Sequence, residues 1–335
     1  MLHLYNVWAP EATHVDLVLG ADGGQVEPMK EAGEGWGSLD AASGDGRYAC
    51  SLAGGDPMPD PRGWRQPDGV HAPSALVDTG TFTWTDDNWT GKHLKGSVIY
   101  EVHVGTFTAE GTFDAAIEHL EHLADLGIDV VELMPVASFP GHSGWGYDGV
   151  ALYSVQEAYG GPHGLQRFVD AAHAHGLAVW LDVVYNHLGP DGNYLPQYGP
   201  YFTDRHQTPW GVAVNLDGPG SDEVRAYFTD NVRMWLADYH LDGLRLDAVH
   251  ALHDDQAVHL LEEMALLAQQ VTAASGVPRM LVAESDRNDP ATVAPPGPGG
   301  AGGQGMDGQW TDDVHHALHV ALTGEGQGYY AGFAG

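Results

Sequence analysis

Two charged residues interrupt an apolar stretch of the sequence, GLRLDAVH at residues 243–250. Arg245 and Asp247 are two residues apart, so in a β-strand their side chains share one face and Leu244 and Leu246 take the other. Burying a guanidinium or a carboxylate is costly, and even a buried pair often gains nothing over apolar residues. The pair is therefore more typical of a functional site than of a core strand.

Other charged residues also stand at the ends of apolar runs. Asp182 and His187 lie in AVWLDVVYNH, and Glu284 lies in RMLVAES. Two carboxyl groups can divide acid–base work when a cation keeps one ionised and burial beside a negative charge keeps the other protonated. Asp247, next to a cation, fits the first role, and Glu284 fits the second.

The pattern of the chain after residue 96 predicts strands alternating with helices. The predicted strands are 97–107, 129–136, 178–185, 243–248 and 279–285, with a sixth near 305–313, and the predicted helices are 113–126, 164–175, 221–239 and 254–274. Near-continuous apolar strands alternating with helices indicate a parallel sheet covered on both faces. In a parallel barrel the active site forms at the C-terminal ends of the strands, where Asp182, Asp247 and Glu284 are expected.

Residues 1–85 have a different pattern and are predicted to form an N-terminal domain. The short runs LHLYNVWAP, THVDLVLG and RYACSLAG are bounded by Gly and Pro, and ADGG and EAGEGWG are predicted turns. Short strands separated by Gly- and Pro-containing turns indicate a small β-sandwich. Residues 86–335 are predicted to form an α/β barrel. An eight-unit barrel takes about 250 residues, and the strands found here are too few, so we expect this chain to lack the C-terminal strands.

Composition limits the partners and the compartment. The 335 residues include 46 acidic and 13 basic ones, a net charge of −33 that disfavours nucleic acids and anionic membranes as partners. No apolar run approaches the ~20 residues of a membrane span. The first residues lack the pattern of a signal peptide, and the single Cys50 excludes an internal disulfide. We therefore expect a cytoplasmic protein.

Three motifs, DVVYNH (182–187), GLRLDAVH (243–250) and VAES (282–285), resemble three sequence regions of the α-amylase superfamily, glycoside hydrolase family 13, in order and spacing. The resemblance covers nearly the whole chain, because the N-terminal part is similar to the immunoglobulin-like, carbohydrate-binding-like sandwich that precedes the barrel in branching and debranching members. It implies a (β/α)8 TIM barrel, incomplete in this chain, an α-glucan substrate and no cofactor.

The resemblance also implies roles for particular residues. Asp247 would be the nucleophile and Glu284 the general acid/base of a retaining glycosidase, and Arg245 would hydrogen-bond Asp247, keep it ionised and orient it. Aromatic rings at Trp145 and Trp210 would stack on sugars. The substrate-binding positions that the resemblance implies are Tyr147, Asp182, His187, His250, Asp312, Asp313, His315 and His316.

One expected feature of the superfamily is missing from the sequence. Members carry a third catalytic carboxylate, the aspartate of an HD pair on a later strand, and no such pair follows Glu284. Asp312 and Asp313 come too early, because this stretch precedes that strand in related enzymes. The resemblance therefore places the third aspartate beyond residue 335, which would leave the chain as given with most of the site but without activity.

Longer stretches of the sequence resemble one particular group within the superfamily. Residues 139–154, 185–203 and 310–330 are similar to members that hydrolyse the α-1,4 bond next to the terminal trehalose of maltooligosyltrehalose. Branching enzymes share the catalytic regions but are not associated with the last stretch. Three functions stay open at this point: a trehalose-releasing hydrolase, a 1,4-α-glucan branching enzyme, and a non-catalytic α-glucan-binding protein.

Several other patterns have structural explanations. Asp182 and Asn186 could brace loops, and Tyr147 could be a packed loop aromatic. His315 and His319 have the spacing of a zinc pair, but no third ligand is identifiable and packing or substrate contact is favoured, so no metal is expected. The Pro/Gly-rich segment 290–308 is predicted to be a flexible loop. Its Gly-rich run, 297–305, lacks the setting of a phosphate-binding loop, and HDD at 253–255 is predicted to begin a helix.

Overall fold

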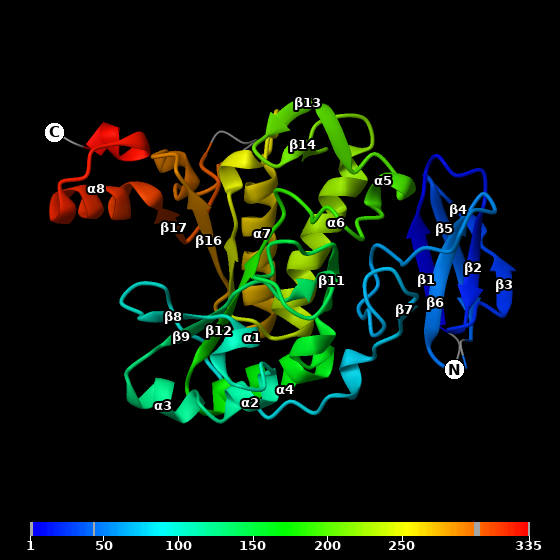
Figure 1. Ribbon diagram of the computed structural model, residues 1–335, viewed down its shortest axis with the longest axis horizontal. Helices are drawn as coiled ribbons and strands as arrows, with labels where there is room; N and C mark the ends of the chain where they lie inside the picture. The colour runs from blue at the N-terminus through cyan, green and yellow to red at the C-terminus, as the bar shows by residue number, and fades with distance from the viewer. Residues whose placement is uncertain (1–2, 43, 298–301, 334–335) are drawn as a thin grey trace.

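The structure, a computed structural model, describes residues 3–42, 44–297 and 302–333 (Figure 1). An all-β N-terminal part lies beside a larger layered part in which helices pack against a parallel sheet. The larger part is a TIM-barrel-like α/β fold whose parallel sheet has six strands among the described residues. Within these residues no helix combines the length and the apolar character needed to cross a membrane.

The N-terminal part contains two antiparallel sheets. Their orders are β1-β5-β4 and β3-β2-β6-β7, with bounds β1 His3–Trp8, β2 Val15–Leu19, β3 Gln25–Pro28, β4 Lys30–Gly33, β5 Trp36–Ala41, β6 Arg47–Leu52 and β7 Ser74–Ala75. The predicted strands at β1, β2 and β6 are confirmed. The prediction of a turn for EAGEGWG was wrong in extent. Only Glu34 and Gly35 lie outside strands there, both with positive φ, and β4 and β5 pair across them.

The parallel sheet has the order β17-β16-β15-β12-β9-β8, and every neighbouring pair is parallel. The bounds are β8 Ile99–Val102, β9 Val130–Leu133, β12 Ala178–Val183, β15 Gly243–Leu246, β16 Met280–Ser285 and β17 Gly308–Thr311. All six predicted strands are therefore confirmed. The first is shorter than predicted, because residues Val104–Phe107 form a helical turn, α1.

The helices that cover this sheet begin and end close to the predicted positions, except that α7 begins six residues later than predicted. The main ones are α2 Phe113–Ile117, α3 Leu120–Asp125, α4 Gly161–Ala174, α6 Ser221–Arg233 with its π-helical continuation η3 Met234–Asp238, and α7 Leu260–Ser275. A further helix, α8 Asp312–Thr323, has no buried residue and extends away from the sheet (Figure 1). The prediction that HDD begins a helix was wrong, because α7 begins at Leu260. The Asp254 carboxylate instead accepts the Leu260 N–H from outside the helix and pairs with Arg225.

Short elements connect the main ones. They are η1 Thr79–Thr81, β10 Ala137–Ser138, β11 Ala151–Val155, η2 Glu157–Tyr159, α5 Leu195–Tyr198, β13 Phe202–Thr208, β14 Gly211–Val214, η4 Val249–Ala251, η5 Pro290–Thr292 and η7 Gly328–Phe333. The predicted loop 290–308 contains η5 and leads into β17. Its residues 298–301, and with them part of the Gly-rich run, lie outside the described residues.

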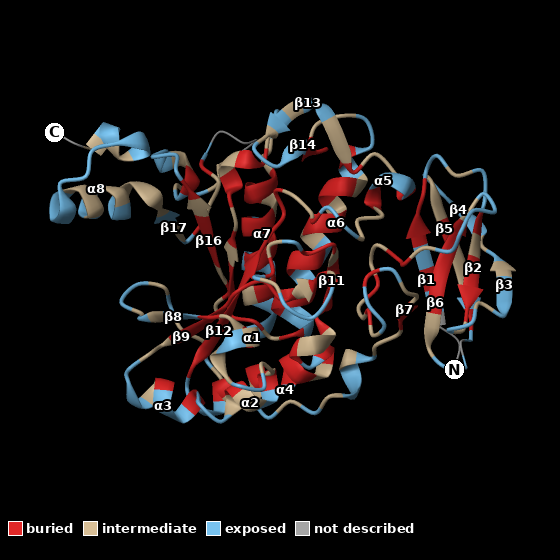
Figure 2. Cartoon of the chain, viewed as in Figure 1, coloured by how far each residue is buried: buried red, intermediate tan, exposed pale blue. Residues whose placement is uncertain are grey.

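Strands β9 and β12, in the middle of the parallel sheet, are buried along their length (Figure 2). The two faces of the sheet bury different side chains. Leu244 and Leu246 of β15 are fully buried in the main core on the helix side. A smaller cluster that includes Val130, Trp180 and Val282 fills the inner face. Arg245 shares the inner face, as the alternation of the strand predicted.

The segment between β6 and β7 binds to the α/β part. The Tyr198 hydroxyl donates to the Pro59 carbonyl at 2.9 Å, and the Tyr227 hydroxyl donates to the Pro61 carbonyl at 3.1 Å. Arg62 donates to Tyr153 Oη at 2.9 Å. These contacts hold the all-β part against the helices near α5 and α6. The domain boundary between residues 85 and 86 stays a prediction.

Candidate active site

The charged residues predicted at strand ends meet in the structure. Asp182 of β12 is the register partner of Arg245 of β15, and Asp247 follows β15 directly. Glu284 lies at the end of β16, which pairs with the other side of β15. Parallel register therefore brings side chains from three neighbouring strands to one edge of the sheet.

Arg245 is the centre of this group. Its Nη1 lies 2.6 Å from Oδ1 of Asp247 and 2.8 Å from both carboxylate oxygens of Asp182. Its Nη2 lies 3.8 Å from Oε2 of Glu284. The side chain amide of Asn186 donates to Oδ2 of Asp247 at 2.7 Å, so both oxygens of that carboxylate are held. The predicted hydrogen bond between Arg245 and Asp247 is confirmed.

Asp182 is buried beneath this group. Its Oδ2 accepts the Tyr147 hydroxyl at 2.8 Å in addition to the Arg245 contact. Burial raises the pKa of Asp182 to about 7, with the Asp247 charge adding to the rise and Arg245 opposing it. Tyr147 is thus tied to the site through Asp182, and burial together with that carboxylate raises the pKa of the phenol.

Glu284 has the electrostatic environment expected of an acid. Burial raises its pKa, and the negative charges of Asp247 and Asp312 act in the same direction. The Ala248 N–H, which donates to Oε2 at 2.6 Å, and Arg245 oppose the rise. The direction predicted for the pKa of Glu284 is confirmed.

Glu132 of β9 is a buried carboxyl that the sequence reading missed. It is 2% exposed, and its Oε2 has no hydrogen-bond partner among the described residues. Burial raises its pKa to about 7, and the nearby Asp182 charge contributes. The signal was present, because the run VVEL places one acidic residue inside an apolar strand, as GLRLD does.

Three rings, those of His187, Trp210 and Trp145, form what we call the rim of the candidate site. His187 faces two acceptor oxygens, with Nδ1 at 2.5 Å from Asn186 Oδ1 and Nε2 at 3.0 Å from the Tyr147 carbonyl. Its ring stacks on Trp210 of the β13–β14 hairpin, with centroids 5.1 Å apart and planes 4° apart. Trp145 is 72% exposed. Both tryptophans are thus available for contact with a sugar.

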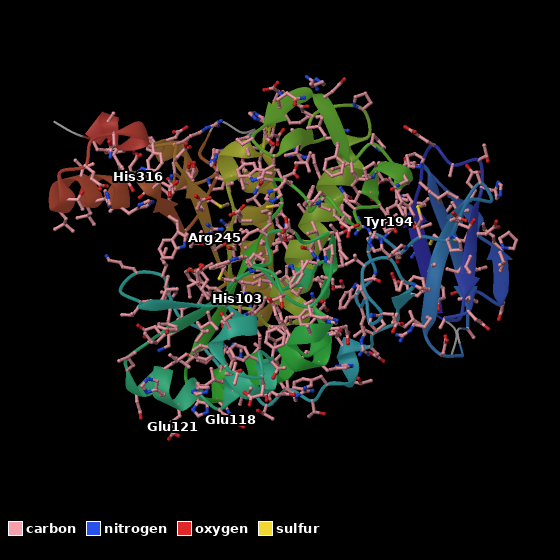
Figure 3. All side chains as sticks on the ribbon, viewed as in Figure 1. His103, Glu118, Glu121, Tyr194, Arg245 and His316 are labelled. Atoms are coloured by element: carbon pink, nitrogen blue, oxygen red, sulfur yellow. The ribbon has the colours of Figure 1, made fainter. Side chains whose placement is uncertain are left out.

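The remaining predicted positions make no hydrogen bond or ion pair with Arg245 within the part of the chain that the structure describes, although the charge of Asp312 acts on Glu284. His250 Nδ1 is 3.7 Å from Asp286 Oδ1. On α8, Asp312 pairs with His315 at 3.1 Å, and His316 packs its ring against Tyr329 and other rings. Figure 3 shows His316 on α8, apart from Arg245.

No contact places Asp313 at the charged group within the described residues. His319 pairs with Glu325 at 2.7 Å, so its Nε2 has a partner other than a metal. Substrate binding by Asp312, Asp313, His315, His316 and His250 stays a prediction.

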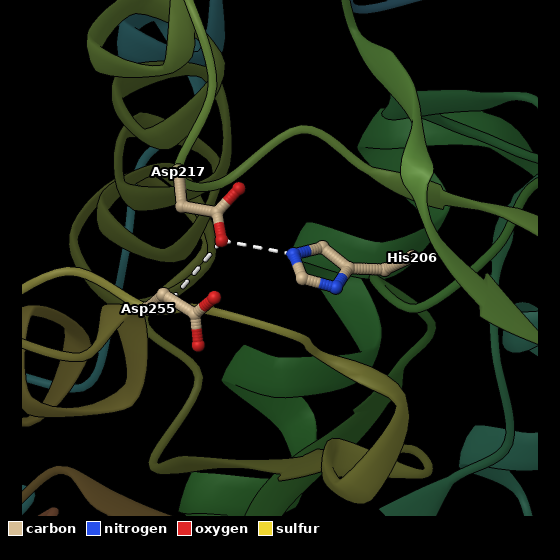
Figure 4. Close-up of side chains that lie close together, drawn as sticks. All are labelled: His206, Asp217 and Asp255. Carbon is tan, nitrogen blue, oxygen red and sulfur yellow. Dashed lines mark hydrogen bonds and ion pairs between the residues drawn. The ribbon is translucent and has the colours of Figure 1, made fainter.

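One cluster outside this site has metal-ligand residue types (Figure 4). Ligand atoms of His206, Asp217 and Asp255 lie within 4.8 Å of one another. The Asp217 carboxylate already accepts from His206 at 2.9 Å and from Arg205 at 2.8 Å. Its Oδ2 also accepts the Asp255 backbone N–H at 3.2 Å. An ion-pair network that fastens the β13–β14 hairpin to the loop before α7 accounts for this cluster.

Comparison with known proteins shows what this chain is similar to. Residues 67–205 match the family model of the α-amylase catalytic domain. The malto-oligosyltrehalose trehalohydrolase of Rhizobium sp. (strain M-11) is 54% identical over 98% of this chain and 56% of its own length. The protein of the same name from Arthrobacter ramosus is 52% identical over 99% of this chain and 58% of its own length.

This chain is thus similar to the α-amylase catalytic domain over residues 67–205 and to the trehalohydrolases over nearly its whole length. A crystal structure of a putative alpha amylase from Salmonella typhimurium superposes with a TM-score of 0.90 at 42% identity, covering 99% of this chain and 56% of that one. A branching enzyme of the cyanobacterium Synechococcus sp. (strain JA-3-3Ab) is 32% identical over 74% of this chain and 38% of its own length. The chain thus spans little more than half the length of the curated relatives with the higher identity.

Proposed function

We propose that this chain belongs to the α-amylase family and supplies the catalytic carboxylates of a retaining glycoside hydrolase that releases trehalose from maltooligosyltrehalose. The observation that carries the proposal is the position of the Arg245 guanidinium between two carboxyl groups. Its Nη1 lies 2.6 Å from Oδ1 of Asp247, and its Nη2 lies 3.8 Å from Oε2 of Glu284. Retaining glycosidases need two such carboxyl groups about 5–5.5 Å apart, one ionised and one protonated.

The first step breaks the glycosidic bond. An oxygen of Asp247 attacks the anomeric carbon while Glu284 gives its proton to the departing glycosidic oxygen, leaving a glycosyl ester on Asp247. Arg245 and Asn186 fix the two oxygens of Asp247 before substrate arrives, so little reorganisation is needed at the moment of attack. The raised pKa of Glu284 keeps its proton bound to a higher pH than an exposed glutamate would, as a general acid requires.

The second step regenerates the site. Glu284, now a carboxylate, takes a proton from a water molecule, and the water oxygen attacks the anomeric carbon and displaces Asp247. Both carboxyl groups return to their starting protonation states. The Tyr147–Asp182–Arg245 chain of hydrogen bonds supports the nucleophile through both steps.

The substrate that we propose for this chain is supported by the names of its relatives and by the rings around the candidate site. The curated relatives with 52% and 54% identity carry the name trehalohydrolase. We assign sugar-stacking roles to Trp210 and Trp145 and substrate contact to His187 and Tyr147. We also propose that residues 1–85 form an immunoglobulin-like sandwich domain that helps to bind glucan.

The direct test incubates the chain with maltooligosyltrehalose and separates the products by chromatography. A parallel chimera adds the part of the Rhizobium relative that the match does not cover. We expect free trehalose. Glu284→Gln should reduce its release by about 10²–10⁴-fold, the contribution of general acid catalysis, and Asp247→Asn should also reduce it, because the nucleophile is lost. Glucan affinity should survive Glu284→Gln. If neither protein releases trehalose, the proposal is wrong.

Two other outcomes would select the alternatives. New α-1,6 linkages formed from amylose would indicate a branching enzyme, a function that the 32% identical relative keeps open. Glucan binding that is unaffected by Asp247→Asn, with no turnover in the chimera, would indicate a non-catalytic glucan-binding protein.

A further inference from the structure

Ala248 has a backbone conformation that is unusual for a residue with a side chain. Its φ of 42° and ψ of 50° are left-handed, a region that L-residues other than glycine, asparagine and aspartate rarely enter. It comes directly after Asp247 and is 4% exposed. Backbone strain of this kind persists only where the surroundings enforce it, and it concentrates at functional sites.

The left-handed turn redirects the backbone between two strands. The Asp247 N–H still donates to the Val183 carbonyl of β12 at 3.0 Å, as a continuing strand would. The next N–H, that of Ala248, donates at 2.6 Å to Oε2 of Glu284 on β16, which lies on the opposite side of β15. The Asp247 amide thus fixes the backbone at Asp247 to β12, and the Ala248 amide fixes the side chain of Glu284.

We propose that the left-handed turn at Ala248 is a positioning device that reserves Oε2 of Glu284 as a hydrogen-bond acceptor and leaves Oε1 as the oxygen that exchanges its proton with the substrate. The acid role of Glu284 rests on the proposed function. The orientation of its carboxyl group does not, because it follows from the backbone contact alone.

The charges around Glu284 support this division of its two oxygens. The Arg245 Nη2 approaches Oε2 at 3.8 Å, so a guanidinium and an amide both face that oxygen. A proton on Oε2 would oppose two donors, since each needs an acceptor. Oε1 makes no hydrogen bond within the part of the chain that the structure describes. Asp247 and Asp312, the other charged groups that affect Glu284, are negative and favour its protonated form.

NMR of the chain itself tests the proposal without turnover. Glutamate carboxyl carbons and backbone amides are labelled, and Glu284→Gln assigns the Glu284 signal. The Ala248 amide proton should shift with pH at the same midpoint as the Glu284 carboxyl carbon. Its protection from hydrogen exchange should persist below that midpoint, because the proton then sits on Oε1. An amide that titrates independently of Glu284, or that loses protection on protonation, overturns the proposal.

An amide-to-ester replacement gives the matched experiment. Lactic acid incorporated at position 248 keeps the methyl group but removes the N–H, and the Glu284 midpoint should rise by about 1 pH unit or more, because the lost hydrogen bond favoured the ionised form. Ala248→Gly keeps the N–H and should leave the midpoint unchanged. The same ester at Ala251, whose N–H bonds the Ala248 carbonyl, controls for the chemistry of the replacement.

An unchanged Glu284 midpoint in the position 248 ester would also overturn the proposal. If that ester fails to fold, the titration of the unmodified chain still decides. Failure of the trehalose assay would refute the proposed function and leave these titrations unaffected, so the two ideas fail separately.

Discussion

Nη1 of Arg245 lies 2.8 Å from each carboxylate oxygen of Asp182. The same nitrogen reaches Asp247, so one guanidinium neutralises two carboxylates in a largely buried setting. The charged group is therefore a triad, and Arg245 cannot be regarded as a partner of Asp247 alone.

Arg245→Leu should strongly destabilise the chain. Removing the cation leaves two carboxylates close together without a partner, and breaking a buried ion pair in this way costs about 3–5 kcal/mol of unfolding free energy. Urea denaturation at pH 8 measures the loss. Arg233→Leu is the control, because Arg233 is exposed and should change stability by less than about 0.5 kcal/mol. An equal loss of unfolding free energy in Arg245→Leu and Arg233→Leu would contradict the role of Arg245 as the partner of both carboxylates.

Tyr147→Phe tests the hydrogen bond from the Tyr147 hydroxyl to the buried carboxyl group of Asp182. The lost hydrogen bond to an ionised Asp182 should reduce the unfolding free energy by about 1.5–3 kcal/mol at pH 8. Because the pKa of Asp182 is about 7, the loss should be smaller at pH 5, where the carboxyl group is neutral. Tyr100→Phe, at a residue that is 39% exposed, is the comparison. A pH-independent effect would show that packing, rather than the carboxylate, explains the result.

Much of the fold followed from periodicity. The apolar runs ending at Val183, Leu246 and Ser285 are strands, because short runs between helices have few other ways to bury their side chains. Parallel register then determines that Asp182, Arg245 and Glu284 converge. Alternation along the strand was enough to place Arg245 opposite its leucine neighbours.

Other features depend on tertiary contacts that local patterns do not encode. The start of α7 at Leu260 depends on Asp254, which bonds across six residues and to Arg225. The left-handed turn at Ala248 could not be read from an alanine, which favours right-handed conformations. Glu132 was missed because one glutamate in a short apolar run is not distinctive until its neighbours on adjacent strands are known.

Trp210→Ala should weaken glucan binding without affecting the fold. The indole is 48% exposed and stacks on His187, so it offers a free edge and face to a sugar ring. Loss of one aromatic stack should reduce the affinity for maltoheptaose about 2- to 10-fold in titration calorimetry. Val212→Ala, an exposed change in the same hairpin, should leave affinity unchanged. Full affinity in Trp210→Ala would remove this residue from the binding surface.

The buried Glu132 should make stability depend on pH. Its pKa rises from an ordinary value of 4.5 to about 7 on folding, so between these values the native state binds more protons than the unfolded state. The resulting stabilisation is complete below pH 4.5 and is lost as the pH rises through 7. Glu132→Gln removes this dependence and should raise the unfolding free energy at pH 8 by at most about 3 kcal/mol relative to the parent. Urea denaturation from pH 5 to pH 8 measures the pH slope of the unfolding free energy in the parent and in Glu132→Gln, with Glu121→Gln, at an exposed glutamate on α3, as the control. A Glu132→Gln protein with the pH slope of the parent would show that Glu132 is already ionised in the folded chain.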